Sequence, residues 1–121
     1  MKKYILIADD DVELNEGLAE LLKGEGYLVC SVSNGEEAVK EAGKQHFDLI
    51  VLDYKMEKMN GRETLIELKK IAPEVKVIFI SGNPFIEKIK EEKEFSGNII
   101  CALSKPFSIE KFIASVSEAC K

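Results

Sequence analysis

The sequence predicts an α/β domain whose core is an open, doubly wound sheet of five parallel strands with helices on both faces. Short apolar runs alternate five times with amphipathic segments along the chain, a pattern typical of this fold class. One run, at 49–52, is apolar at every position, as expected for a strand that is covered on both faces. Polar residues follow four of the five runs directly, at the edge where such sheets place their functional groups.

The composition fits one soluble globular domain over residues 1–121. Of these residues 45% are apolar and 32% are charged, and no repeat, linker or low-complexity tract interrupts them. A net charge of −5 argues against a basic surface for nucleic acid. No apolar run is long enough to span a bilayer, and the aspartates after the apolar opening at 4–8 are unlike an export signal.

The three cysteines and the single histidine leave little room for a disulfide framework, a zinc site or a histidine-activated nucleophile. Cys30, Cys101 and Cys120 are odd in number and show no CxxC spacing. Cys30 and Cys101 lie in apolar runs and are expected to be buried thiols, which indicates a reducing compartment, the cytoplasm. His46 lies in a polar stretch and is expected to be solvated.

The first strand–helix–strand unit is predicted over residues 4–32. The apolar runs at 4–8 and 27–32 are expected to be strands. Between them, apolar residues recur at roughly helical spacing and predict an amphipathic helix that ends at Gly24 and Gly26. The apolar positions of this helix are Val12, Leu14, Leu18, Leu21 and Leu22.

Residues 33–72 predict a second helix, the central strand and a third helix. A turn at 33–35 caps the helix expected over 36–43. The strand over 47–52 follows, and a loop then leads to the third helix, which ends before Pro73. The inward residues of the two helices are expected to be Ala38, Val39, Ala42, Leu65, Leu68 and Ile71.

The last third of the chain predicts two strands, over 75–80 and 99–103, and two helices. Residues 85–93 predict the weaker helix, since most of its residues are Glu or Lys. The last helix is expected to begin at Ser108, a favourable N-cap, with Glu110 in its first turn. The apolar residues of the two helices are Phe85, Ile86, Ile89, Phe112, Ile113, Val116 and Ala119.

The polar residues that follow the strands are expected to meet at one edge of the sheet. Three aspartates at 9–11 follow the first strand, Asp53 ends the third, and Ser81 and Lys105 follow the fourth and fifth. Crowded carboxylates resist joint ionisation, and an oxygen-only site with room for water suits Mg²⁺. A metal, an ammonium and a hydroxyl around one carboxylate are the groups needed to hold a phosphoryl group.

Each of these features also has a simpler explanation. Asp53 could cap a strand, and the aspartates at 9–11 could be an acidic start to a helix. Residues 81–82 could be a turn, and Lys105 could lie in an ordinary loop. Their joint placement at the ends of four strands favours a shared site.

Four motifs occur in order along the chain: ILIADDD at 5–11, DLIVLD at 48–53 with an MxxMNG loop to Gly61, VIFISG at 77–82, and LSKPF at 103–107. With these motifs the chain resembles a receiver domain of a two-component response regulator over essentially its whole length. The resemblance implies the CheY-like, flavodoxin-like fold, with the strands in the order 2-1-3-4-5.

The resemblance also implies a chemistry. Asp53 would be the phosphoacceptor, which attacks the phosphohistidine of a sensor histidine kinase or a phosphotransfer protein. Asp10 and Asp53 would bind Mg²⁺ together with the backbone carbonyl of Lys55, and Asp9 would act largely through water. The domain would thus catalyse its own phosphorylation and dephosphorylation, although it is primarily a signalling domain.

The residues after the fourth and fifth strands would carry the switch. By the resemblance, Ser81 turns towards the phosphoryl oxygens, Lys105 pairs with them, and the bond before Pro106 is cis. The added charge would draw in both loops and bias the surface formed by the fourth helix, the fifth strand and the last helix. An unknown downstream protein would bind this surface, and the domain would be a monomer or a phosphorylation-dependent dimer without nucleic-acid or membrane contacts.

The chain departs from the family at several positions. Ala102 stands where the family usually has an aromatic side chain whose rotation reports the signal, so coupling is expected to run through the backbone or other side chains. Lys55 and Asn83 occupy positions that tune hydrolysis of the acyl phosphate, and Lys55 is expected to shield the phosphoryl group. Glu57 replaces a common proline.

Three other functions compete with this interpretation. A haloacid dehalogenase-type phosphohydrolase with Asp9 as nucleophile needs a late acidic pair, and no aspartate follows Asp53. An FMN module needs a phosphate-binding loop after the first strand, where the aspartates would repel the phosphate. A receiver-like interaction module that is never phosphorylated stays open, as does the output of the domain.

Overall fold

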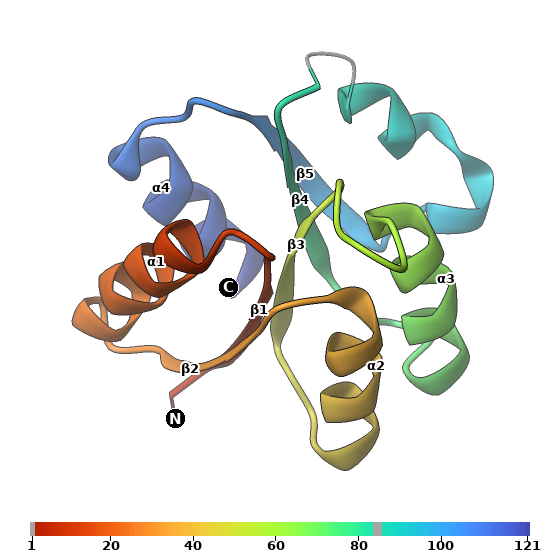
Figure 1. The fold of residues 1–121 in the computed structure, drawn as a ribbon, viewed down its shortest axis with the longest axis horizontal. Coiled ribbons are helices and arrows are strands. Elements are labelled where there is room, and N and C mark those ends of the chain that lie inside the picture. Colours follow the sequence, from red (N-terminus) through yellow and green to blue (C-terminus); the bar gives the residue numbers. More distant parts are fainter. Residues whose placement is uncertain (1, 84–85) are drawn as a thin grey trace.

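Five parallel strands form the centre of the computed structural model, which describes residues 2–83 and 86–121. Their spatial order is β2-β1-β3-β4-β5 (Figure 1). The strands are β1 (Tyr4–Ala8), β2 (Leu28–Val32), β3 (Leu49–Asp53), β4 (Val77–Ser81) and β5 (Ile99–Ser104). The predicted fold class and strand order are confirmed.

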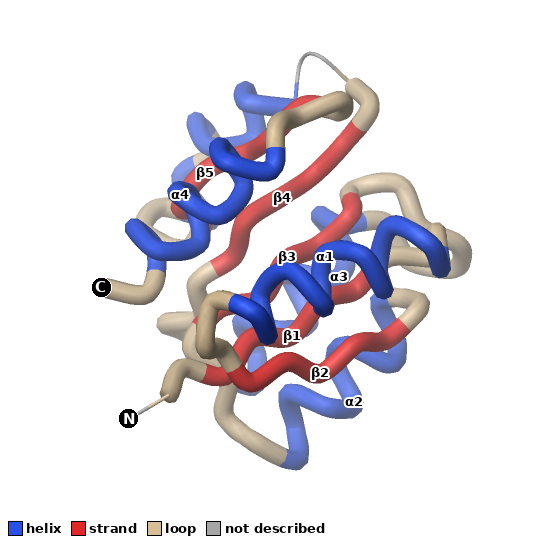
Figure 2. Tube along the Cα trace, turned by 90° about the vertical axis from the view of Figure 1, so that its left-hand side faces the viewer, coloured by secondary structure: helices blue, strands red, loops and turns tan. Residues whose placement is uncertain are grey.

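Helices cover both faces of this sheet (Figures 1 and 2). One face carries α1 (Val12–Gly24) and α4 (Ile109–Ala119), and the other carries α2 (Gly35–Lys44) and α3 (Gly61–Ile71). Within the described residues, no helix has the length and apolar character needed to cross a membrane.

The connection between β4 and β5, here called the crossover segment (86–98), differs from the prediction. A helix was expected over 85–93, but the chain forms two 3-10 helices, η1 (Ile86–Glu91) and η2 (Lys93–Phe95). The described chain therefore has four α-helices rather than five. An amphipathic stripe is too sparse here to favour a regular α-helix, because the inward groups are Ile86, Ile89 and Phe95. The remaining predicted apolar residue, Phe85, lies outside the described residues.

The central strand β3 is buried along its whole length because both faces of the sheet are covered. Successive side chains point to opposite faces. Leu49 and Val51 pack in the core beneath α1 and α4, whereas Ile50 and Leu52 pack in the core beneath α2, α3 and the crossover segment. The strand thus runs through the middle of the domain and brings Asp53 to its edge.

The α-helices begin at polar caps that the sequence already contains. The predicted cap Ser108 accepts from the backbone N–H of Lys111, and Asn34 accepts from that of Glu37. At Asn60 a reciprocal capping box with Glu63 starts α3. These caps satisfy amide groups that a helix leaves unpaired.

Predictions from apolar character alone made two strands too long and placed two exposed residues in the core. The predicted strands at 47–52 and 75–80 begin two residues too early, because Phe47 and Val75 are buried but lie outside the strands. Val12 and Ile71 were expected to face inward, yet they are 61% and 46% exposed, since each is a terminal residue of its helix.

The cysteine prediction also needs correction. Cys30 and Cys101 are half-buried rather than buried, because β2 and β5 are the edge strands of the sheet. All three cysteines are free. The prediction for His46 is confirmed, since its side chain is 83% exposed and pairs with Asp48 at 3.4 Å.

Candidate functional site

Three carboxylates meet where β1 and β3 end. One oxygen from each of Asp9, Asp10 and Asp53 lies within 4.8 Å of the others. The register explains this, because Ala8 pairs with Leu52 and the next residues are Asp9 and Asp53. Asp9 and Asp53 are buried, whereas Asp10 is exposed. The cluster therefore opens to solvent on the side of Asp10.

Asp9 has an unusual setting for a carboxylate. It is fully buried, and its Oδ1 atom accepts from the backbone N–H of Asp11 at 2.9 Å. Its Oδ2 atom has no hydrogen-bond partner among the described residues. Burial, reinforced by the charge of Asp53, raises the pKa of Asp9 to about 6. A cation beside this oxygen would stabilise its ionised form.

Lys105, which directly follows β5, brings a positive charge to the carboxylates. Its Nζ atom lies 3.5 Å from Oδ2 of Asp53 and 3.8 Å from Oδ2 of Asp9. The backbone N–H of Lys105 donates to the carbonyl of Ser81 at 2.7 Å, which fixes where β5 ends. The Lys105–Pro106 bond is cis, as the resemblance implied.

Ser81 ends β4 beside this cluster and is buried. β4 lies next to β3, and Asp53 pairs with Ile80 in their register. The Ser81 hydroxyl accepts from the backbone N–H of Asn83 at 3.0 Å. The Ser81 hydroxyl is therefore oriented by a hydrogen bond from Asn83, which is exposed.

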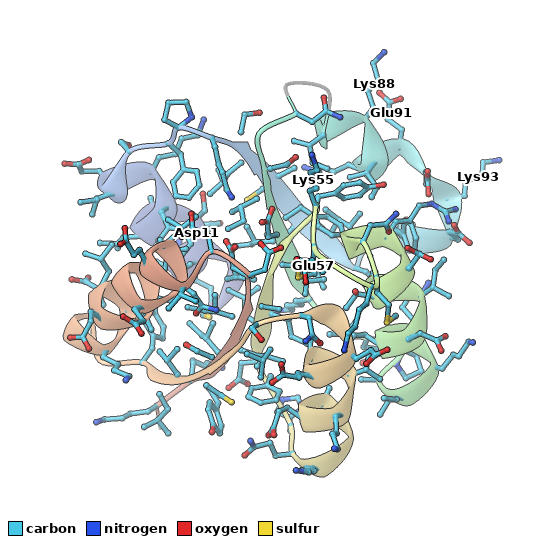
Figure 3. All side chains as sticks on the ribbon, in the orientation of Figure 1. Asp11, Lys55, Glu57, Lys88, Glu91 and Lys93 are labelled. Atoms are coloured by element: carbon cyan, nitrogen blue, oxygen red, sulfur yellow. The ribbon has the colours of Figure 1, made fainter. Side chains whose placement is uncertain are left out.

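The loop between β3 and α3 is held at a fixed distance from the sheet. The backbone N–H of Gly61 donates to the carbonyl of Tyr54 at 2.7 Å. A Cβ atom on Gly61 would lie 2.6 Å from Cε1 of Phe79 and 2.9 Å from Cα of Tyr54, so only glycine fits. Lys55 and Glu57 are exposed and point away from the ribbon (Figure 3).

Ala102 is buried and pairs with Phe79 in the register of β4 and β5. It belongs to the same apolar cluster as Ile86 and Ile89 of η1. The ring of Phe79 packs edge-on against Tyr54, with centroids 5.6 Å apart. An aromatic contact beside Asp53 is thus present, but it comes from β4 and the loop rather than from β5.

The sequence analysis did not identify Asn15. This residue is buried in α1, and its amide contacts the backbone of Asp9. An asparagine at an inward position of the apolar pattern of α1, between Leu14 and Leu18, was the signal that could have identified it.

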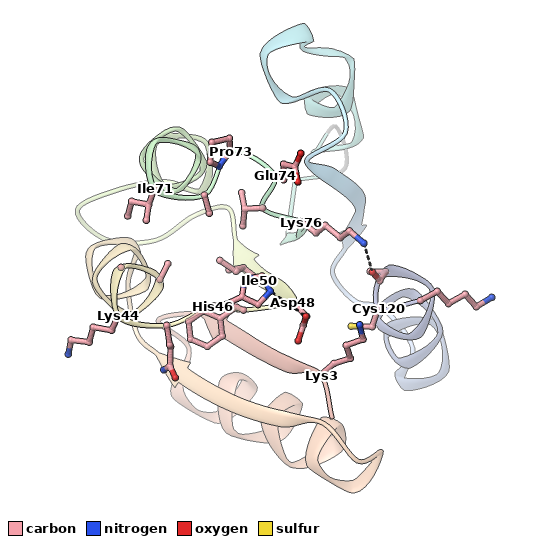
Figure 4. A pocket seen from close by; sticks show the side chains of 18 residues that line it. Lys3, Lys44, His46, Asp48, Ile50, Ile71, Pro73, Glu74, Lys76 and Cys120 are labelled. Atoms are coloured by element: carbon pink, nitrogen blue, oxygen red, sulfur yellow. Dashed lines mark hydrogen bonds and ion pairs between the residues drawn. The ribbon is translucent and has the colours of Figure 1, made fainter. Parts of the chain in front are cut away.

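A groove of about 880 Å³ lies at the opposite edge of the sheet (Figure 4). Its lining includes Lys3, His46, Asp48, Lys76 and Cys120. Asp48 accepts from the backbone N–H of Tyr4, and Lys76 donates to the carbonyl of Ala119. Because Asp48 and Lys76 are hydrogen-bonded to backbone groups at this end of the domain, the acidic cluster is the better candidate for a reactive site.

Comparisons with known proteins agree with this geometry. The family model described as the response regulator receiver domain matches residues 5–117. The sporulation initiation phosphotransferase F of Bacillus subtilis is 31% identical over 118 residues, which cover 98% of this chain and 94% of that protein. The transcriptional regulatory protein ZraR of Klebsiella oxytoca is 32% identical over 115 residues, but these cover 95% of this chain and only 26% of that protein.

Solved structures give the same result. The response regulator protein TrrA from Thermotoga maritima, in complex with Mg²⁺–BeF, has a TM-score of 0.83 at 28% identity and covers 98% of this chain and 99% of its own. A CheY-like receiver domain protein from Methanospirillum hungatei has a TM-score of 0.88 at 25% identity, with 99% and 94% covered.

Proposed function

The chain belongs to the response regulator receiver domain family, and we therefore propose that residues 1–121 form one receiver domain that is phosphorylated on Asp53. The placement of Asp53 suits this role. Its carboxylate is buried at the end of β3, near two further carboxylates and 3.5 Å from the ammonium group of Lys105.

We propose that the carboxylate cluster binds Mg²⁺. Asp10 and Asp53 would hold it with the backbone carbonyl of Lys55, and Asp9 would act largely through water. The donor set fits, because Mg²⁺ prefers a few carboxylate oxygens and retained water. The buried Oδ2 atom of Asp9, which has no hydrogen-bond partner among the described residues, fits as well. When bound, the metal neutralises charge on the carboxylates and the phosphoryl oxygens.

The chain's own groups account for the transfer. An oxygen of Asp53 attacks the phosphorus of a phosphohistidine, the P–N bond breaks, and its electron pair leaves with the imidazole. Lys105 stays beside the carboxylate and stabilises the negative charge of the phosphoryl oxygens. The Ser81 hydroxyl gives up its hydrogen bond with the backbone N–H of Asn83 and forms one with a phosphoryl oxygen instead.

The phosphoryl donor in this proposal is a sensor histidine kinase or a histidine phosphotransfer protein. The change at Ser81 and Lys105 would be relayed to the surface formed by the crossover segment, β5 and α4. Both residues lie where β4 and β5 leave the sheet, so drawing in their loops moves the ends of that surface. The three free cysteines support the cytoplasm as the compartment.

The proposal is tested by incubating the chain with acetyl phosphate and Mg²⁺ and measuring its intact mass. We expect one phosphoryl adduct, which is labile at alkaline pH, on the wild type and none on Asp53→Asn. Asp11→Asn is the matched control, because Asp11 is an N-cap on the same edge and asparagine caps equally well. If the wild type takes no adduct, or Asp53→Asn keeps it, the chain is a receiver-like interaction module instead.

We further propose that Lys55 lengthens the life of the acyl phosphate by shielding it from water. Lys55 lies two residues beyond Asp53, on the exposed loop (Figure 3). Decay of the adduct after removal of donor and metal should be faster in Lys55→Ala than in the wild type. Lys58→Ala changes another exposed lysine of that loop and should decay as the wild type does. Equal decay of both variants would exclude the shielding role.

A further inference from the structure

Asn15 is one of the few polar residues in the core. It is the fourth residue of α1 and is 6% exposed. Its Nδ2 atom donates to the carbonyl of Asp9 at 3.0 Å and to that of Val32 at 2.8 Å. The two carbonyls belong to neighbouring chain segments, the ends of β1 and β2, so one side-chain amide joins the two strands where they leave the sheet.

The orientation of the Asn15 amide follows from these two acceptors. Turning the amide over would place Oδ1 against both carbonyls and remove two hydrogen bonds. In the observed orientation Oδ1 is buried without a partner among the described residues, which is unfavourable. A side chain that only filled the core would be apolar at this place. The two N–H donors are therefore the reason for an asparagine here.

These two bonds belong to a network of hydrogen bonds around Asp9, which is one of the three clustered carboxylates. The backbone N–H of Asp9 donates to the carbonyl of Val32 at 3.2 Å, and that of Asn15 donates to the carbonyl of Asp11 at 2.9 Å. Asp11 in turn donates its N–H to Oδ1 of Asp9. Without the Asn15 amide, the carbonyl of Asp9 would lose a buried donor, and the peptide plane between Asp9 and Asp10 would be held by fewer bonds.

We propose that Asn15 is a positioning residue of the acidic site. It holds the backbone at Asp9 so that the carboxylates of Asp9 and Asp10 both face the cation. The proposal rests on the proposed function, because it assigns Asn15 to the Mg²⁺ site of that function. Groups that orient metal ligands typically change metal affinity by about 10–100-fold when they are removed.

The chain contains a matched residue at the other edge of the sheet. Asn98 is 4% exposed, and its Nδ2 atom donates to the carbonyls of Pro73 and Val75 at 3.0 and 2.8 Å. Asn98 thus also donates to two backbone carbonyls, but both of them lie in the segment that enters β4, and Asn98 itself directly precedes β5. Asn98 is expected to stabilise the fold as Asn15 does, but it lies far from the carboxylates.

The experiment is a calorimetric titration of Mg²⁺ into the wild type, Asn15→Leu and Asn98→Leu, with thermal unfolding of each in EDTA. Leucine is close to asparagine in shape and removes both donors. We expect Asn15→Leu to raise the Kd for Mg²⁺ about tenfold. Asn98→Leu should keep the wild-type Kd although its melting temperature falls by a comparable amount.

The outcomes separate the two proposals. If the wild type binds Mg²⁺ and both variants bind it equally well, Asn15 is only structural and the inference is overturned, while the proposed function stands. If the wild type binds no Mg²⁺, both are overturned. Should a leucine variant not fold, Asn15→Ser and Asn98→Ser replace it, since serine is too short to bridge two carbonyls. The same difference in Kd is then expected, and its absence overturns the inference.

Discussion

The Nζ atom of Lys105 lies 3.5 Å from Oδ2 of Asp53, although the two residues are 52 positions apart in the sequence. β4 separates their strands, so the contact exists only because β3 and β5 both end at this edge. The contact places a positive charge beside the proposed nucleophile before any phosphoryl group arrives. The sheet thus offsets part of the negative charge of the carboxylates at this edge.

Removing this charge should slow the proposed phosphorylation. We expect Lys105→Met to lower the rate of adduct formation from acetyl phosphate about tenfold or more, which is less than the about 100–1,000-fold typical of a buried donor because Lys105 is partly exposed. The rate is followed by intact mass at fixed Mg²⁺. Lys111→Met, which changes an exposed lysine on α4, should react as the wild type does. A wild-type rate in Lys105→Met would remove Lys105 from the site.

Burial of Asp9 should make the metal-free fold less stable as the pH rises. The pKa of Asp9 is about 6 in the folded chain against an ordinary value of 3.8, so folding favours the protonated form. The stability that folding gains from protonated Asp9 is therefore lost between about pH 4 and pH 6, and above this range the loss amounts to about 3 kcal/mol.

Asp9→Asn removes this titration and keeps an acceptor for the N–H of Asp11. In EDTA at pH 7 the variant should unfold at higher urea than the wild type, and the difference should shrink as the pH falls towards 4. Urea unfolding at several pH values measures this. Parallel pH profiles of the two proteins would contradict the prediction.

Gly61 should tolerate no side chain. A Cβ atom there meets the ring of Phe79 and the backbone of Tyr54, so we expect Gly61→Ala to cost about 1–3 kcal/mol. Gly17 is the matched control, because it lies within α1 and a Cβ built there meets no atom within 4 Å beyond its chain neighbours and the nearby backbone of its own helix. Gly17→Ala should stabilise the chain by about 0.5–1 kcal/mol. Urea unfolding compares the two, and equal shifts would show that the loop gives way.

The sequence was sufficient for most of the fold because local signals agree with it. The apolar run at 49–52 and the N-cap Ser108 each indicate an element from neighbouring residues alone. The meeting of Asp9, Asp53, Ser81 and Lys105 at one edge could also be predicted, since in a parallel sheet all strands end at that edge.

The sequence was insufficient where contacts between distant residues determine the local structure. Arg62 of α3 pairs with Glu92 at 3.1 Å and with Glu94, and it lies 5.4 Å from the ring centroid of Phe95. These contacts bridge about thirty positions and connect α3 with the crossover segment. Asn15 was missed for a related reason. An asparagine on an amphipathic helix looks the same whether it is solvated or bonded to two strand ends.

Arg62 should therefore control the mobility of the crossover segment. We expect Arg62→Met to speed amide hydrogen exchange within 86–98, because it removes two ion pairs and a cation–π contact. Lys70→Met removes an exposed ion pair within α3, between Lys70 and Glu67. It should leave the hydrogen exchange of the crossover segment unchanged. Hydrogen exchange read by mass spectrometry compares them. Unchanged exchange in Arg62→Met would mean that the apolar contacts alone hold the segment.

Ala102 stands where the resemblance led us to expect an aromatic side chain, and its packing suits a small residue. Its register partner is Phe79, and Ile86 and Ile89 of η1 share its cluster. A buried alanine leaves room for the crossover segment to lie close to the sheet. An aromatic ring on the same side would have to displace η1.

Ala102→Tyr should then be destabilising by about 1–3 kcal/mol, as expected for overpacking, and should speed hydrogen exchange within 86–98. Ala114→Tyr adds the same ring at an exposed position of α4 and should change stability by no more than about 0.5 kcal/mol. If Ala102→Tyr is as stable as the wild type with unchanged exchange, the crossover segment leaves space for a ring. The family's aromatic rotation could then operate in this fold. Otherwise we expect the proposed signal to travel through the Ser81 and Lys105 loops into the crossover segment, whose position would depend on the small residue at 102.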